Sequence, residues 1–201
     1  MPNEPAEIVH LSPVEIWYLY KSKILLYGGI LVAALVIFGG FQLRETLRTN
    51  GSLALYANAK TAEEFQAVLQ KYPGTIAAGN AALRLADLLR TDKKYDESVA
   101  VLRAFVEKYP THPLAAGGWL SLASTYEAQG KLDEALDANN SAISKYPDAY
   151  ATPIAMMAQA RIYLLKGQKD DARRTYMDVA SRFQQSLYAR QAQRELLFIQ
   201  K

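Results

Sequence analysis

The chain of 201 residues is long enough for one domain with a hydrophobic core, with at most an appendage beside it. Its residues are 50% hydrophobic and 21% charged, which is typical of a folded protein and excludes a disordered chain. The net charge of +3 is too small to indicate nucleic-acid binding. There is no cysteine and there are only two histidines, His10 and His112, so disulfides, thiolate chemistry, a cysteine-linked lipid and most histidine-based sites are excluded.

An apolar stretch over residues 24–43 follows a polar, interfacial tail of residues 1–23. The stretch carries no charge, and a helix of its length spans about 30 Å, the thickness of a bilayer core. Trp17 precedes it and Arg44 follows it, as is typical of the two membrane interfaces. We therefore predict a transmembrane helix over residues 24–43. A cleaved signal peptide is disfavoured because glutamates precede the stretch and no small-residue cleavage site follows it.

Small residues within this stretch predict a contact with another membrane helix. Gly29, Ala33 and Gly40 lie near one face, where a second helix could approach closely. Glycine is also common in membrane helices that make no such contact. Equal numbers of basic residues flank the two ends of the stretch, so the charge pattern does not determine which side of the membrane the rest of the chain faces.

The remainder of the chain is an internal repeat with a period of 37 residues. The phrase Lys-Tyr-Pro ends at Pro73, Pro110 and Pro147, and Arg182-Phe183-Gln184 stands where a fourth would fall. Small and apolar residues recur within each unit at spacings of three and four, which predicts two packed helices per unit. We predict an all-α solenoid of helical hairpins over residues 44–201. Its parts are a half-repeat (44–73), three repeats (74–110, 111–147 and 148–184) and a C-terminal capping helix (185–201).

Turn and capping residues agree with this division. Gly130 and Gly167 stand at the break between the two helices of their units, and Lys93 occupies the same position in the first unit. Thr61 and Glu64 form the pattern of a capping box at the start of a helix in the half-repeat.

The central unit carries a family resemblance. In order and spacing it resembles the tetratricopeptide repeat, with three extra residues between units, at Trp119, Leu122, Ala123, Tyr126, Ala135, Ala142 and Pro147. The neighbouring units depart from the pattern at the tryptophan position, where they have Ala82 and Met156, and the last unit lacks the proline. The resemblance implies a curved solenoid whose first helices line a groove for a peptide or helix of a partner.

The order of the parts is similar to that of the ancillary subunit family of the bacterial Sec translocon. This resemblance implies an N-terminus in the cytoplasm, a span in the inner membrane and a periplasmic repeat domain that works beside the translocon and chaperones. The Tyr-Pro phrase also resembles repeats of bacterial envelope proteins such as the β-barrel assembly lipoprotein, but that protein needs an N-terminal cysteine and this chain has none.

No motif for catalysis, cofactor binding or metal binding is present, and we predict a protein that is not an enzyme. His112 falls in the loop between units, where we expect an exposed side chain without a ligand role. Acidic residues at the starts of second helices are explained by the helix dipole without acid chemistry.

The predicted partner-binding groove follows from the tetratricopeptide pattern. Its positions, one set per turn of the first helices, are Leu83, Leu120 and Met157, then Asp87, Ser124 and Arg161, then Arg90, Glu127 and Leu164. The apolar set either binds a partner or packs against neighbouring helices. The carboxylate clamp of some family members needs Lys and Asn where the first unit has Leu83 and Asp87, so a receptor for chaperone tails is disfavoured.

These features predict a membrane-anchored interaction scaffold outside the cytoplasm that assists a protein-export or envelope-assembly complex. Its partners would be proteins and, through residues 24–43, the lipid bilayer, with no nucleic acid, cofactor or small-molecule substrate. Two alternatives remain open. One is a structural accessory subunit of a large membrane complex, and the other is a repeat receptor or assembly factor that faces the cytoplasm.

Overall fold

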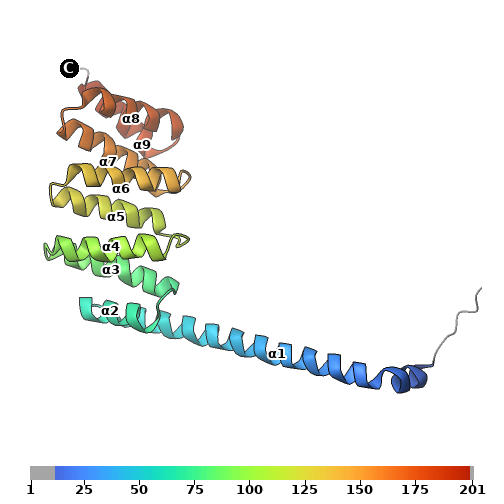
Figure 1. Ribbon diagram of the computed structural model, residues 1–201. Helices are drawn as coiled ribbons and strands as arrows, with labels where there is room; N and C mark the ends of the chain where they lie inside the picture. The colour runs from blue at the N-terminus through green and yellow to red at the C-terminus, as the bar shows by residue number, and fades with distance from the viewer. Residues whose placement is uncertain (1–11, 200–201) are drawn as a thin grey trace, which may run out of the picture. The chain divides into compact units, whose positions relative to one another are not determined.

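The structure is a computed structural model that describes residues 12–199. Over that range it is helical and contains no strand, which confirms the predicted all-α fold class. In chain order the helices are α1 (Pro13–Asn58), α2 (Ala62–Lys71), α3 (Ile76–Thr91), α4 (Tyr95–Lys108), α5 (Ala115–Ala128), α6 (Leu132–Lys145), α7 (Ala151–Leu165), α8 (Lys169–Arg182) and α9 (Leu187–Ile199) (Figure 1). Residues 1–11 of the predicted tail, with His10, and residues 200–201 of the predicted cap lie outside the described part.

The first of two compact units ends at Arg48 and consists of most of α1. This helix begins inside the predicted tail because Ser12 and Glu15 form a capping box. The Glu15 backbone N–H donates to Ser12 Oγ at 3.3 Å, and the Ser12 N–H donates to Glu15 Oε2 at 2.8 Å. The Ser12 N–H and the Ser12 hydroxyl, which both donate to Glu15 Oε2, lower the pKa of Glu15 below its usual value. The sequence has no proline between Pro13 and Pro73, and the helix runs beyond both ends of the predicted 24–43 span.

The apolar part of α1 has no partner in the described chain. Its most apolar 18-residue window has a mean hydropathy of 2.4, and 0% of that window is buried. By length and composition, α1 alone among the described helices could cross a membrane.

The second unit begins at Thr49, so the last turns of α1 belong to the repeat domain. Tyr56 of α1 packs on Phe65 of α2 with 6.0 Å between ring centroids. The predicted capping box at the start of α2 is confirmed, because Thr61 Oγ1 accepts the Glu64 N–H and Glu64 Oε2 accepts the Thr61 N–H. Backbone donors at Lys60 and Thr61 hold the pKa of Glu64 below its usual value.

Helices α2 to α8 follow one another in chain order along the stack, α9 lies beside α8 and α7, and each helix from α2 on contacts the next (Figure 1). Helices α3 and α4, α5 and α6, and α7 and α8 form the three predicted hairpins, followed by α9. First helices also contact one another across the stack, α3 with α5, α5 with α7, and α7 with α9. The repeat domain is therefore a solenoid of helical hairpins.

The turn inside each hairpin has the same backbone geometry. Lys93, Gly130 and Gly167 have φ of 60°, 73° and 75°, the left-handed conformation that ends a helix. The residue after each donates its N–H to the carbonyl five positions back, as in Lys94 to Leu89 at 2.8 Å. The predicted break between helices is thus confirmed, and the first unit places a lysine where glycine is favoured.

The tyrosines of the Tyr-Pro phrases link successive units. Tyr109 Oη accepts the N–H of Gly74 at 3.2 Å, and Tyr146 Oη donates to the carbonyl of Pro110 at 2.9 Å. Each hydroxyl reaches the turn that joins its own hairpin to the preceding unit. These contacts between units give the phrase a structural role in the spacing of the repeat.

His112 is buried, so the prediction that it is exposed is wrong. The residue is 8% exposed, and its ring lies edge-on to those of Phe105 and Tyr109. Leu114 donates its N–H to Nδ1 at 3.0 Å, which leaves Nε2 to donate to the carbonyl of Ile76 at 3.2 Å. Both ring nitrogens are satisfied by backbone groups, so the histidine closes the turn between two units.

Candidate functional site

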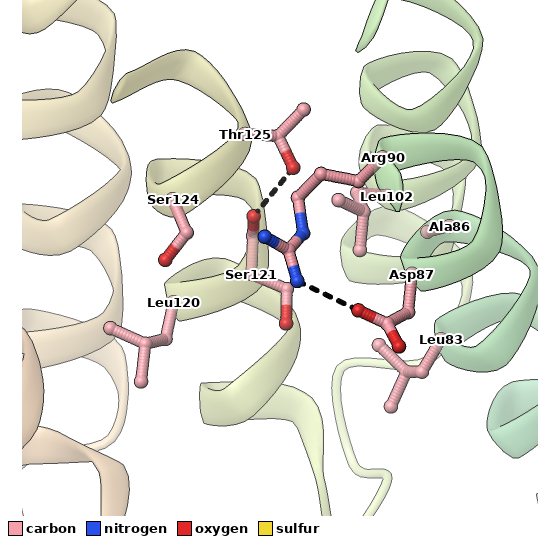
Figure 2. Close-up of a pocket in the computed structure, with 9 residues that line it drawn as sticks. All are labelled: Leu83, Ala86, Asp87, Arg90, Leu102, Leu120, Ser121, Ser124 and Thr125. Atoms are coloured by element: carbon pink, nitrogen blue, oxygen red, sulfur yellow. Dashed lines mark hydrogen bonds and ion pairs between the residues drawn. The ribbon is translucent and has the colours of Figure 1, made fainter. Parts of the chain in front are cut away.

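The predicted groove contains a pocket between α3 and α5, which we call the groove pocket. It has a volume of about 200 Å³. Figure 2 shows its lining residues, which are Leu83, Ala86, Asp87, Arg90, Leu102, Leu120, Ser121, Ser124 and Thr125. Five of the nine predicted groove residues are among them. The structure therefore brings five of the six predicted positions of the first two units together in one pocket.

Apolar and charged side chains share this pocket. Leu83 and Leu120 are half-buried and belong to neighbouring first helices. Figure 2 shows the Arg90 guanidinium in the space between α3 and α5, where its Nη2 donates to Asp87 Oδ1 at 2.8 Å. Both side chains of this ion pair are about half exposed, so the pair contributes only about 0–1 kcal/mol to stability. A partner can therefore displace it at little cost.

The floor of the groove pocket is polar on the α5 side. Thr125 is fully buried, and its hydroxyl donates to the Ser121 carbonyl at 2.8 Å. The Ser124 side chain is exposed beside it. Ser124 and the Arg90 guanidinium can thus form hydrogen bonds with a partner's backbone while the two leucines contact its apolar side chains.

The four other predicted groove residues do not line this pocket. Glu127 of α5 pairs with Arg161 of α7 at 2.5 Å, and the Glu127 side chain is only 13% exposed. This contact joins two successive first helices and sets their spacing. Met157 and Leu164 are half-buried and pack against the core of the third unit. The packing alternative holds for these two residues, and Leu83 too packs against core clusters, those of the first two units, while it lines the groove pocket.

Four lining residues were not predicted, namely Ala86, Leu102, Ser121 and Thr125. Ser121 and Thr125 each follow a predicted position by one residue on α5. Leu102 belongs to the second helix, α4, whereas the predicted groove positions were all taken from first helices. Recurrence of the Leu102 column at the 37-residue period could have indicated a core position.

The predicted contact face of the membrane helix lies on α1. Gly29, Ala33 and Gly40 are exposed, and a Cβ atom added at either glycine would meet no heavy atom within 4 Å. Residues four and seven positions apart share one face of a helix, so the three form a single strip of small residues. Within residues 12–199 there is no cluster of three or more His, Asp or Glu side chains that could hold a metal ion.

One family model described as tetratricopeptide repeat matches residues 56–113 and 83–150, and a second model of the same description matches residues 154–186. Together these ranges take in well over half of the chain and nearly the whole of the hairpin stack. The comparison with curated proteins finds no match.

Solved structures show the same fold. A protein of nearly identical TPR-like repeats from Podosopora anserina has a TM-score of 0.57 and 18% identity over 79% of this chain and 82% of its own. BtubC from P. vanneervenii has a TM-score of 0.58 and 18% identity over 74% of this chain and 65% of its own. A thermophilic TPR protein from Thermus thermophilus has a TM-score of 0.53 and 20% identity over 86% of this chain and 97% of its own.

At these identities the likeness to solved structures concerns the fold alone. The matched repeat models extend from the end of α1 to α8, the same stretch in which the hairpins, the left-handed turns and the groove pocket recur. The chain belongs to the tetratricopeptide repeat family.

Proposed function

We propose that this protein is a membrane-anchored scaffold, without enzymatic activity, whose repeat domain binds a protein partner. The observation that carries the proposal is the groove pocket, where Leu83, Leu120 and Arg90 converge from two units. Tetratricopeptide solenoids use such surfaces to hold extended or helical segments of other proteins. The partner segment would place apolar side chains on the two leucines.

The anchoring part of the proposal rests on α1. Its apolar window has no packing partner within the described chain, and burial in lipid would remove that surface from water. The strip of Gly29, Ala33 and Gly40 would let a helix of a membrane complex pack closely. With the resemblance to the ancillary Sec translocon subunits, this supports a bacterial inner-membrane location, an extracytoplasmic repeat domain and a role in protein export or envelope assembly.

The groove is tested by co-purification of the full chain with its partners in mild detergent. We expect Leu83→Glu with Leu120→Glu to remove the partner, because two carboxylates would replace the apolar contact. The matched control is Leu165→Glu with Met177→Glu, the same kind of change at residues that are 63% and 56% exposed and lie outside the groove pocket. Loss of the partner in both variants, or in neither, would refute groove binding.

A second variant protects this test against a folding defect. Ser124→Tyr adds a bulky side chain at an exposed position of the groove pocket and removes no core contact. It should weaken partner binding while the helical circular dichroism stays unchanged.

Topology is tested by reporters fused to the C-terminus, where a signal from the cytoplasmic side would overturn the extracytoplasmic assignment. Bulky substitution of Gly29 and Ala33 should release the membrane complex if the strip of small residues is a contact.

A further inference from the structure

A second pocket lies among α2, α3 and α4, and we call it the α2–α4 pocket. Its volume is about 510 Å³, and it shares no lining residue with the groove pocket. Its lining includes Leu69, Ala82, Val101, Phe105, Lys108 and Tyr109. Ala82 and Leu83 are adjacent on α3 but line different pockets, so the α2–α4 pocket opens on another side of that helix.

The next unit shows how this kind of pocket is filled. Trp119 stands 37 residues after Ala82, and it lies among α4, α5 and α6 in a pocket of only about 270 Å³. Val106 and Ala138, the counterparts of Leu69 and Val101, line that pocket with it. The Trp119 indole is thus the side chain that the second unit places where the first unit has only a methyl group.

A lysine covers the Trp119 ring of the second unit. Lys145 Nζ lies 4.4 Å from the centroid of the Trp119 ring, a cation–π contact. The counterpart of Lys145 is Lys108, which lines the α2–α4 pocket and is exposed. Within residues 12–199 Lys108 makes no ion pair and covers no aromatic ring. The first unit therefore retains the cation of this arrangement without the indole.

Phe105 does not take the place of the absent indole. Its ring is directed toward α5, where a Cβ atom added at Gly118 would lie 2.3 Å from Phe105 Cε1. It also stacks on Tyr109 with 5.5 Å between centroids. Phe105 forms part of the pocket wall and is 1% exposed, so the space beside Ala82 stays open above it.

We propose that the α2–α4 pocket binds an aromatic side chain of a protein partner, in the way the second unit holds Trp119. The ring would lie on Ala82 and Val101 beneath the Lys108 ammonium group. A carboxylate next to the aromatic residue would pair with the same ammonium group, so the partner segment is acidic and aromatic. The site is a second docking point, separate from the groove, and does not depend on groove binding.

The test uses the full chain in lipid nanodiscs, with its alanine and valine methyl groups labelled for NMR. The probe is the capped tripeptide Asp-Trp-Asp, and the control probe is the capped tripeptide Asp-Ala-Asp. We expect the tryptophan probe to shift the methyl signals of Ala82 and Val101 and to bind at least tenfold more tightly than the alanine probe. Equal binding of the two probes, or shifts confined to other positions, would overturn the proposal.

Two lysine variants sharpen the result. Lys108→Glu should weaken binding of the tryptophan probe at least tenfold because it repels the carboxylates and removes the cation over the ring. Lys145→Glu is the matched control, since the same change is made at the equivalent exposed position, where the cation already covers an aromatic ring of the chain itself. An equal effect of the two variants, or no effect of Lys108→Glu, would contradict the assignment.

A third variant fills the pocket from within the chain. Ala82→Trp places an indole where the second unit has one, and it should abolish binding of the tryptophan probe. If that variant does not fold, the comparison of the two exposed lysines decides the question. Ser124→Tyr, in the groove pocket, should leave probe binding unchanged; loss of binding in that variant would show that the probe uses the groove instead.

Discussion

Asn139 is a buried polar residue whose replacement should stabilise the repeat domain. It is 0% exposed in α6, and neither Oδ1 nor Nδ2 has a hydrogen-bond partner in the described part of the chain. An unpaired buried amide costs about 1–3 kcal/mol. The position 37 residues earlier holds Leu102, which is 1% exposed, so the same place in the fold accepts a branched apolar side chain. We expect Asn139→Leu to raise the free energy of unfolding by about 2 kcal/mol, the middle of that range.

The assay is thermal unfolding of the full chain in detergent, followed by far-ultraviolet circular dichroism of the helices. For a domain of this size a gain of about 2 kcal/mol corresponds to a rise in Tm of about 4–8 °C. The reciprocal variant Leu102→Asn buries a new unpaired amide and should lower Tm. A fall in Tm for Asn139→Leu would show that the Asn139 amide has a partner worth more than its burial costs, and it would refute the reasoning.

Three further predictions concern other positions in the repeat domain. Gly118→Ala should destabilise the domain by about 1–3 kcal/mol, since the new Cβ would lie 2.3 Å from Phe105 Cε1. The control Gly117→Ala meets no atom within 4 Å and should raise Tm slightly. Equal effects of the two variants in thermal melts would contradict the packing argument. Lys93→Gly should stabilise the first hairpin by up to about 1 kcal/mol by relieving a φ of 60°, and a lower Tm would count against strain there. The pKa of Glu64 is lowered in the fold, so the stabilising effect of the Glu64 carboxylate is present above pH 4.5 and is lost as pH falls through the lowered pKa. Backbone amide exchange at the start of α2 should accelerate in that pH range. Glu64→Gln should remove the pH dependence of this exchange.

The helices and their order could be predicted from the sequence because the signals are local and repeated. A left-handed turn needs glycine or tolerates a residue such as Lys93, and the capping box at Thr61 needs only residues three apart. Because the units recur every 37 residues, the same turn and helix signals appear at equivalent positions in several units and support one another. The start of α1 at Pro13 was not predicted, although its capping box is equally local, because the predicted bounds followed the apolar stretch at residues 24–43.

The groove could be predicted only in part. Leu83 and Leu120 line one pocket because they occupy the same face of equivalent helices. Met157 stands in the same column and, like Leu83, packs against a core cluster, but it does not line the groove pocket. The column defines a direction from the helix axis, whereas a pocket depends also on the side chains of the neighbouring helices.

By itself, the sequence determined the solenoid, its period, its turns and the long apolar helix, because these depend on residues close together in the chain. Only the tertiary structure decided which equivalent positions differ. It buried His112 under Phe105 and Tyr109, and it left open beside Ala82 the space that Trp119 occupies in the next unit. Both outcomes depend on how side chains from different helices share one volume, and that sharing is set by packing between units.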